Sequence, residues 1–403
     1  MATTFGGTDS MRAAVSGKPE LNRKINASLV LGLIRGSGPI SRAELAKRTG
    51  IRPASISEIV EDLMQRHLVV EGELGPSTGG RQPVMLSVNP SGFFGVGVEI
   101  GEDGVNGVLV DLSGEVLASA RVPLNETDPK SVVRGVASLV EKVRDRARIA
   151  TKRLGGLGVA VPGIVSRQEG SVVLSRPLQW ENVSLRAMLK EATGLETLVL
   201  NNATAGALSQ LLDKATDGIR SILYILVYLR HIRQTTITSV GSGIVLDGRA
   251  YLGEGQMAGE IRVDIEHPLA TAAHRLGRSA PSKMEDLVNP SIAGHREVKE
   301  VWSIFAESLG RVVSRGIDFL NPGGVVIGSD TPELENLIGE RLRDVIRDNT
   351  VSGLVAGLKG DAVRPGVAIR FSPLRTETLA RGAIVPHMQE LSLVPQLHDS
   401  VLV

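Results

Sequence analysis

A group of residues between positions 42 and 81 has side chains of the kinds that recognise double-stranded DNA. Its arginines can neutralise backbone phosphates, and its small or hydrogen-bonding residues can fit against base edges in a major groove. The group consists of Arg42, Arg52, Ala54, Ser55, Ser57, Glu58 and Arg81. Phosphates would repel Glu58 unless its carboxylate accepts a hydrogen bond from a cytosine amine. We therefore expect a few specific contacts rather than a uniformly basic surface.

Two consecutive helices would position these residues. Ser41 is suited to cap the first helix, because Glu44 stands at its N3 position and completes a capping box. Gly50 would end this helix, and a second one would begin at Pro53. The second helix has an apolar stripe with the spacing i, i+3, i+4, i+7, formed by Ile56, Ile59, Val60 and Leu63. Its opposite, small-residue face could then lie deep in a major groove, as a recognition helix does.

A Gly-rich hairpin follows the two helices. Residues 68–74 and 84–88 read as strands, and the loop 75–83 between them carries Arg81 near its tip. Between Arg23 and Arg52 the only acid is Glu44, so this region is basic. Any single charge here could be an ordinary solvated residue, but the order of helix, turn, helix and wing indicates a winged helix-turn-helix.

The bulk composition limits the other classes of function. The chain has 403 residues, a net charge of +1 and no cysteine, which excludes disulfides and thiolate metal sites. The first twenty residues lack the apolar core of a signal peptide, and the longest apolar run, 222–229, is too short to span a bilayer. We therefore expect a cytoplasmic protein without a membrane partner.

The remainder of the chain reads as an α/β body built twice on one scheme. The first half has β-rich runs over 93–122, followed by a helix over 128–149, a strand over 157–161, a helix over 185–192, a strand over 197–200 and a helix over 203–212. The second half has β-rich runs over 221–252, followed by a helix over 298–320, a strand over 325–327, a helix over 334–347, a strand over 368–371 and a helix over 376–391. Two such lobes would leave a cleft where ligands usually bind.

A set of ordered motifs in this body resembles the ROK family, which is named for repressors, open reading frames and kinases. The segments are GVGVEIGEDGVNGVLVDLSGEVL, GVAVPGIV, LNNATAGAL, GSGIVLDGRAYLGEGQMAGEI and NPGGVVIGS. The resemblance implies an actin-like, ribonuclease-H-like two-lobe fold of the ATPase type, with a sugar bound in the cleft. In the family's regulators the front domain binds operator DNA as part of a dimer or tetramer, whereas its kinases transfer a phosphoryl group from ATP.

Three departures from the family's kinases argue against ATP chemistry. Those kinases have an Asn-Asp pair where this chain has Asn201 and Asn202, and an amide cannot act as the general base. The first phosphate loop is here Gly-Glu-Asp-Gly at 101–104, whose carboxylates would repel a triphosphate. The second loop has Ile-Thr-Ser-Val at 237–240 in place of a Gly-Thr-Gly run, and the bulky side chains block close approach to phosphate. We therefore expect no catalysis and no cofactor.

The resemblance implies that part of the sugar site remains. Asn201, Asn202 and Glu260 match positions that hydrogen-bond sugar hydroxyls in the family, and Glu285 matches a later sugar-binding glutamate if about three residues are inserted before it. Trp180 could offer a ring face to the sugar or serve only as a hydrophobic anchor.

The zinc site of the family is not expected. The family's Gly-His is here Arg262-Val263, and its cysteine cluster falls near 273–284, where this chain has no cysteine. His267, His274 and His295 follow no metal-binding spacing, so we expect ordinary surface or packing roles for them.

Together these observations favour a DNA-binding transcriptional regulator, most simply a repressor of sugar-related genes. Its segments would be a flexible leader over 1–20, the winged helix over 21–90, a first lobe over 91–215 and a second lobe with the oligomerisation surface over 216–403. A sugar or sugar phosphate would be the effector, and a homodimer or homotetramer would read the operator. Two alternatives stay open: a ROK sugar kinase with an appended DNA-binding domain, and a regulator controlled by a protein partner.

Overall fold

The computed structural model describes residues 19–76, 82–213, 219–229, 239–261, 263, 287–288, 294–351, 353, 367–375 and 377–391. The chain folds into two compact units, one formed by 1–93 with 388–403 and the other by 94–387. The leader up to residue 18, the wing tip with Arg81, and Glu285 lie outside the described residues. The positions predicted for the leader and for the domain boundaries stay predictions.

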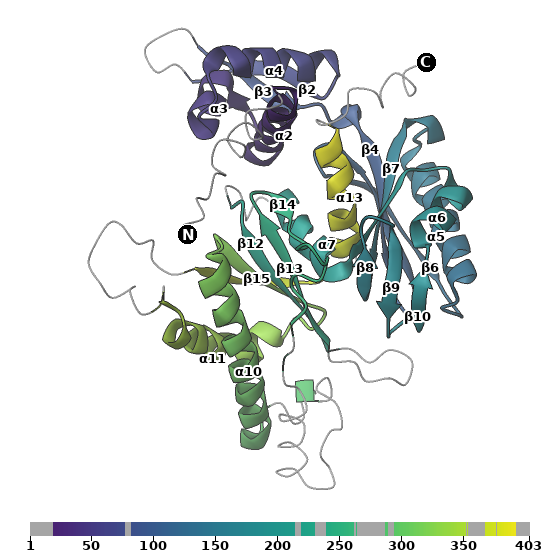
Figure 1. Cartoon of the computed structure of the whole chain (residues 1–403), viewed down its shortest axis with the longest axis vertical. Helices are drawn as coiled ribbons and strands as arrows, with labels where there is room; N and C mark the ends of the chain where they lie inside the picture. Colours follow the sequence, from purple (N-terminus) through teal and green to yellow (C-terminus); the bar gives the residue numbers. More distant parts are fainter. Residues whose placement is uncertain are drawn as a thin grey trace, which may run out of the picture. The chain divides into compact units, whose positions relative to one another are not determined.

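The first unit is a small helical bundle with a hairpin (Figure 1). Its helices are α2 (Pro19–Ser37), α3 (Arg42–Thr49) and α4 (Pro53–Gln65), and its strands are β1 (Ile40–Ser41), β2 (Val69–Leu74) and β3 (Val84–Val88), in the sheet order β1-β3-β2. The stripe on α4 predicted from Ile56, Ile59, Val60 and Leu63 is fully buried, which confirms the amphipathic pattern. These elements form a winged helix-turn-helix.

The predicted ends of α3 are also confirmed. The Ser41 hydroxyl accepts a hydrogen bond from the Glu44 amide at 3.2 Å, as an N-cap does. Gly50 adopts the left-handed conformation with φ 70° and closes the helix through its amide. Helix α2 was not predicted, although Ala27, Val30, Leu31 and Ile34 recur at helical spacing and are buried.

The second unit contains the predicted repeat (Figure 1). The first sheet has the strand order β11-β7-β4-β5-β6. Three of its strands pair antiparallel in sequence order: β4 (Phe94–Ile100), β5 (Gly104–Asp111) and β6 (Val116–Pro123). The other two run parallel to β4: β7 (Leu154–Val161) and β11 (Thr197–Asn201). The second sheet has the strand order β14-β13-β12-β15-β16. Three of its strands pair antiparallel in sequence order: β12 (Ile222–Tyr228), β13 (Ser239–Leu246) and β14 (Arg249–Ala250). The other two run parallel to β12: β15 (Gly324–Ser329) and β16 (Ala368–Pro373). Each half thus has three antiparallel strands followed by two parallel ones.

Helices cover both sheets, and short elements complete the unit. The first half has α5 (Pro129–Ala147) and α6 (Leu185–Thr193), and the second has α10 (Arg296–Leu320) and α11 (Leu334–Asn349). A small sheet of β8 (Ile164–Ser166), β9 (Ser171–Ser175) and β10 (Trp180–Val183), which was not predicted, lies in the first half. The 3-10 turns are η1 (Pro90–Gly92), η2 (Thr151–Arg153) and η3 (Gln210–Leu212).

Two helices, α7 (Asn202–Ser209) and α13 (Thr378–Glu390), pack closely inside the second unit. A Cβ on Gly97 or Gly158 would overlap the backbone of Ala380 or Ala383 on α13, and a Cβ on Gly382 would overlap the carbonyl of Ala205 on α7. Glycines therefore let the backbone of α13 touch β4, β7 and α7 directly. The same helix runs past the division between the units, because its residues from Met388 onward belong to the first unit.

Candidate functional site: a DNA-reading helix and a pocket in the body

The predicted base-reading residues lie together on the first turns of α4. Ala54, Ser57 and Glu58 are exposed and Ser55 is half-buried, while Arg52 is exposed at the N-cap of the helix. The Ser57 hydroxyl donates to the carbonyl oxygen of Pro53 at 3.1 Å, so it keeps its own oxygen free to accept. The exposure of these residues supports the prediction that they contact DNA, which stays a prediction.

Arg42 has a partner within its own unit. Its guanidinium donates to the Glu71 carboxylate at 2.9 Å and lies 3.9 Å from the Met64 sulfur. The ion pair links the start of α3 to strand β2, and both side chains are partly exposed. A phosphate contact by Arg42 would therefore compete with Glu71.

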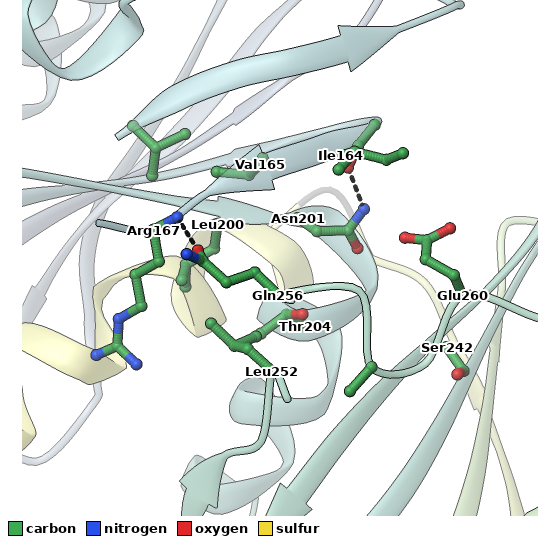
Figure 2. Close-up of a pocket in the computed structure, with 13 residues that line it drawn as sticks. Ile164, Val165, Arg167, Leu200, Asn201, Thr204, Ser242, Leu252, Gln256 and Glu260 are labelled. Atoms are coloured by element: carbon green, nitrogen blue, oxygen red, sulfur yellow. Dashed lines mark hydrogen bonds between the residues drawn. The ribbon is translucent and has the colours of Figure 1, made fainter. Parts of the chain in front are cut away.

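The body contains a pocket at the N-terminal end of α7 (Figure 2). The space between its walls is about 410 Å³ when the open solvent at its mouth is counted, and the cavity itself is about 20 Å³. Its walls come from β8, β11, α7, β13 and the loop after β14, which belong to both halves of the repeat. The lining residues are Gly163, Ile164, Val165, Arg167, Val199, Leu200, Asn201, Thr204, Ser242, Leu252, Gln256, Ala258 and Glu260.

Asn201 forms part of the pocket wall and also holds it in place. Its amide donates to the Gly163 carbonyl at 2.6 Å, and its side-chain oxygen accepts from the Ala203 amide at 2.7 Å and caps α7. One hydrogen and one lone pair of the side chain remain for a ligand. Asn201 therefore suits a role in fixing the pocket as well as in binding.

A tight backbone turn positions Glu260. Gly259 before it has φ +92°, and a Cβ there would lie 2.7 Å from the Ser242 carbonyl oxygen. The Ser242 hydroxyl donates to the Gly259 carbonyl at 2.6 Å, which ties this turn to β13. Figure 2 shows Glu260 and Asn201 on the same side of the pocket. Partial burial raises the pKa of the Glu260 carboxyl.

The other predicted effector residues do not join this pair. Trp180 is 3% exposed in the hydrophobic core of the first half, and its indole donates to the Thr127 carbonyl at 2.6 Å. Asn202 is absent from the pocket lining, and Glu285 lies outside the described residues. Arg167, Thr204 and Gln256 also line the pocket and were not predicted. Thr204 and Gln256 lie within the quoted motifs, close to Asn201 and Glu260, whereas Arg167 lies in a separate segment.

The turns that correspond to the kinase phosphate loops have other contacts here. Asp103 in the β4–β5 turn pairs with Arg121 on β6. A Cβ on Gly243 would overlap the Ala203 carbonyl, and one on Gly241 would lie 3.4 Å from the Ala203 side chain. Gly243 thus lets β13 pack closely on α7, whereas a Cβ on Gly241 would make only an ordinary contact. Ile237 and Thr238 lie outside the described residues.

A half-buried carboxyl connects the two halves of the body. Glu99 on β4 accepts from the Tyr228 hydroxyl of β12 at 3.2 Å and from the Asn106 amide at 3.3 Å. Burial raises the pKa of Glu99, although both hydrogen bonds lower it and Asp103 and Arg121 act in opposite directions. Burial and the nearby Glu99 also raise the pKa of both Tyr224 and Tyr228. Compared with a carboxyl in water, the folded state thus shifts Glu99 toward its protonated form.

We expect Glu99→Gln to make the free energy of unfolding less dependent on pH. A carboxyl whose pKa is raised by folding contributes stability that is complete below its ordinary pKa and is lost as the pH rises through the folded value. The variant should therefore gain stability relative to the parent as the pH rises from about 4, the ordinary glutamate range. Urea unfolding across this range, with exposed Glu181→Gln as the control, would measure it. Parallel curves for parent and Glu99→Gln would contradict the assignment.

The two units define a class of protein: a winged helix-turn-helix joined to a two-lobe, actin-like body. Residues 95–262 match the model of the ROK family. These residues therefore form a ROK family domain, in agreement with the ordered motifs.

Two curated relatives cover nearly the whole chain. It is 26% identical over 415 residues to the xylose repressor of Caldicellulosiruptor bescii, an alignment that covers 94% of this chain and 99% of that protein. It is 24% identical over 408 residues to the DNA-binding transcriptional dual regulator NagC of Escherichia coli, with 93% and 98% covered. Both relatives are named as regulators rather than as enzymes.

A solved structure agrees in fold. The crystal structure of a ROK family transcriptional regulator, a homologue of the E. coli MLC protein, matches with a TM-score of 0.70 at 22% identity, covering 94% of this chain and 99% of that one. Among the described residues, none of the helices is long and apolar enough to cross a bilayer.

The residues present do not fit the zinc of the family. The chain has no cysteine, and Val263 stands where the resemblance places the histidine. Within the described part of the chain, no three His, Asp or Glu side chains are grouped so that they could hold a metal ion.

Proposed function

We propose that the chain is a DNA-binding transcriptional repressor of sugar-related genes, and that its body binds a sugar effector in the pocket beside Asn201 and Glu260. The exposed start of α4 supports operator binding. The match over nearly the whole chain to a protein named as a repressor supports repression rather than activation. A symmetric homodimer or homotetramer would place two winged helices on a pseudo-palindromic operator.

The observation that carries the proposal is the path from the pocket to the reading helix through α13. Thr204 of α7 lines the pocket, and the next residue, Ala205, is in backbone contact with Gly382 of α13. Beyond Met388 the chain belongs to the winged-helix unit, where the Leu391 carbonyl accepts a hydrogen bond from the Arg66 guanidinium. Arg66 is the C-cap of α4. We infer that α13, which contacts α7 at Gly382, couples the pocket to the winged-helix unit.

We further propose that the body does not transfer phosphoryl groups. Asn202 offers no base, Asp103 is paired with Arg121 in the first loop, and Gly243 packs against α7. The regulators among the relatives support this assignment, whereas the fold by itself does not decide it, since kinases share it.

A gel shift on the gene's own upstream region tests the proposal. We expect binding above that of random DNA at matched salt, and release by a sugar through a coupling of about 1 to 3 kcal/mol, or about 5- to 150-fold. Equal affinity for random DNA would overturn the proposal. Specific binding that no sugar alters would favour control by a protein partner, and hexose phosphorylation lost in Glu260→Gln would favour a kinase.

A further inference from the structure

An open groove adjoins the pocket in the body and has no role in the function proposed above. Its cavity volume is about 600 Å³, and it is widely open to solvent. It shares Arg167, Leu252 and Gln256 with the pocket, so the two spaces are neighbours. The residues that belong to the groove alone are Gln168, Ala250, Tyr251, Gly253 and Glu254.

Hydrogen bonds fix both walls of this groove. On one side, the Arg186 guanidinium of α6 donates to the carbonyls of Arg167 and Gln168, at 3.0 Å for the latter. On the other, the Tyr251 amide donates to Ile244 at 2.8 Å and the Ala258 amide to Leu252 at 2.9 Å. The Arg167 amide donates to the Gln256 side chain, and Figure 2 shows this bond across the pocket. The groove is therefore a formed surface rather than a gap between loose loops.

The side chains in the groove suit a second sugar ring. Tyr251 is 47% exposed, and an exposed aromatic face can pack against the apolar C–H face of a ring. Gln168, Glu254 and the Arg167 guanidinium offer donors and acceptors for hydroxyl groups. The charges of Arg167 and Glu254 offset each other, which favours a neutral group over a phosphate.

We propose that the groove is a second subsite, and that the effector is a neutral disaccharide or similar glycoside with one ring in the pocket and the next on Tyr251. This inference rests on the proposed function, because it extends the same sugar site. It places the specificity for chain length on Tyr251 and Arg167, and the recognition of the first ring on Asn201 and Glu260.

Calorimetry on the full-length protein tests the proposal with matched probes: D-xylose with xylobiose, D-glucose with cellobiose and maltose, and N-acetylglucosamine with its 6-phosphate. We expect one disaccharide to bind at least about 10-fold more tightly than its monosaccharide, which corresponds to about 1.4 kcal/mol. Tyr251→Ala should remove this difference and leave the affinity for the monosaccharide unchanged. Met257→Ala is the matched control, because Met257 is 57% exposed in the same loop and lines neither space.

The outcomes separate this inference from the proposed function. A monosaccharide that binds as tightly as its disaccharide, a preference for the sugar phosphate, or a disaccharide preference that survives in Tyr251→Ala would overturn the second subsite and leave a sugar-responsive repressor. Specific operator binding without heat from any probe would overturn the subsite together with sugar sensing. Loss of specific DNA binding would count against the repressor itself.

Discussion

Ala54→Glu should weaken binding to the operator by at least about 10-fold while leaving the protein folded. Ala54 is exposed on the first turn of α4, where the proposed function places base edges and phosphates. A carboxylate there would be repelled by the backbone and would add bulk at the point of closest approach, and one good base contact is worth about 1 to 3 kcal/mol. The same carboxylate favours the helix, because it lies near the positive end of the helix dipole. Fluorescence anisotropy with labelled operator DNA would measure the loss.

Gln65→Glu is the matched control for this experiment. It changes the net charge by the same amount on the same helix, but at an exposed position eleven residues further along, about 16 Å away. We expect a clearly smaller loss of affinity from it. If the two variants lost equal affinity, net charge alone would explain the effect, and an unchanged affinity in Ala54→Glu would exclude α4 as the reading helix.

Gly382→Ala should lower the stability of the body and interrupt its response to the effector. A Cβ at this position would overlap the Ala205 carbonyl and approach the Ser209 amide to 2.9 Å, and backbone atoms cannot rotate away. Overpacking of this kind costs about 1 to 3 kcal/mol, and more when the backbone must move. We expect a lower midpoint for the unfolding transition of the body in calorimetry, and a weaker release from the operator by the effector.

Gly32→Ala makes the same substitution in a helix without the same contact. Gly32 lies in α2, and a Cβ there would have no neighbour within 4 Å. Alanine should stabilise this helix by about 0.5 to 1 kcal/mol. A Gly382→Ala variant as stable as the parent, with full release by the effector, would mean that α13 tolerates separation from α7 and does not transmit the signal.

Local sequence patterns were sufficient for the winged helix. The Ser41 cap, the Gly50 stop and the buried stripe from Ile56 to Leu63 depend on neighbours within a turn or two, so their positions followed from spacing. The repeated body also followed, because β-rich runs and helices alternate in the same order twice. The motif resemblance named Asn201 and Glu260, and both line one pocket, while their role in binding stays a prediction.

Contacts between segments that are distant in the sequence could not be predicted from local sequence patterns. Trp180 was equally consistent with a ligand platform and a core anchor, and only its burial against Thr127 places it in the core. The pairing of Glu99 with Tyr228 joins strands that are 129 residues apart. Gly243 stood in a phosphate-loop motif, whereas its observed neighbour is the backbone of Ala203.

The sequence by itself determined the order of the elements, the ROK-family body and the surface of the helix proposed to read DNA. These depend on periodicity, on caps and on which residue types a kinase requires. The tertiary structure alone decided that the pocket adjoins the groove of Tyr251, and that α13 packs against α7 through Gly382. The physical reason is that both depend on which backbones approach closely, and close packing is a property of the folded chain that no local pattern encodes.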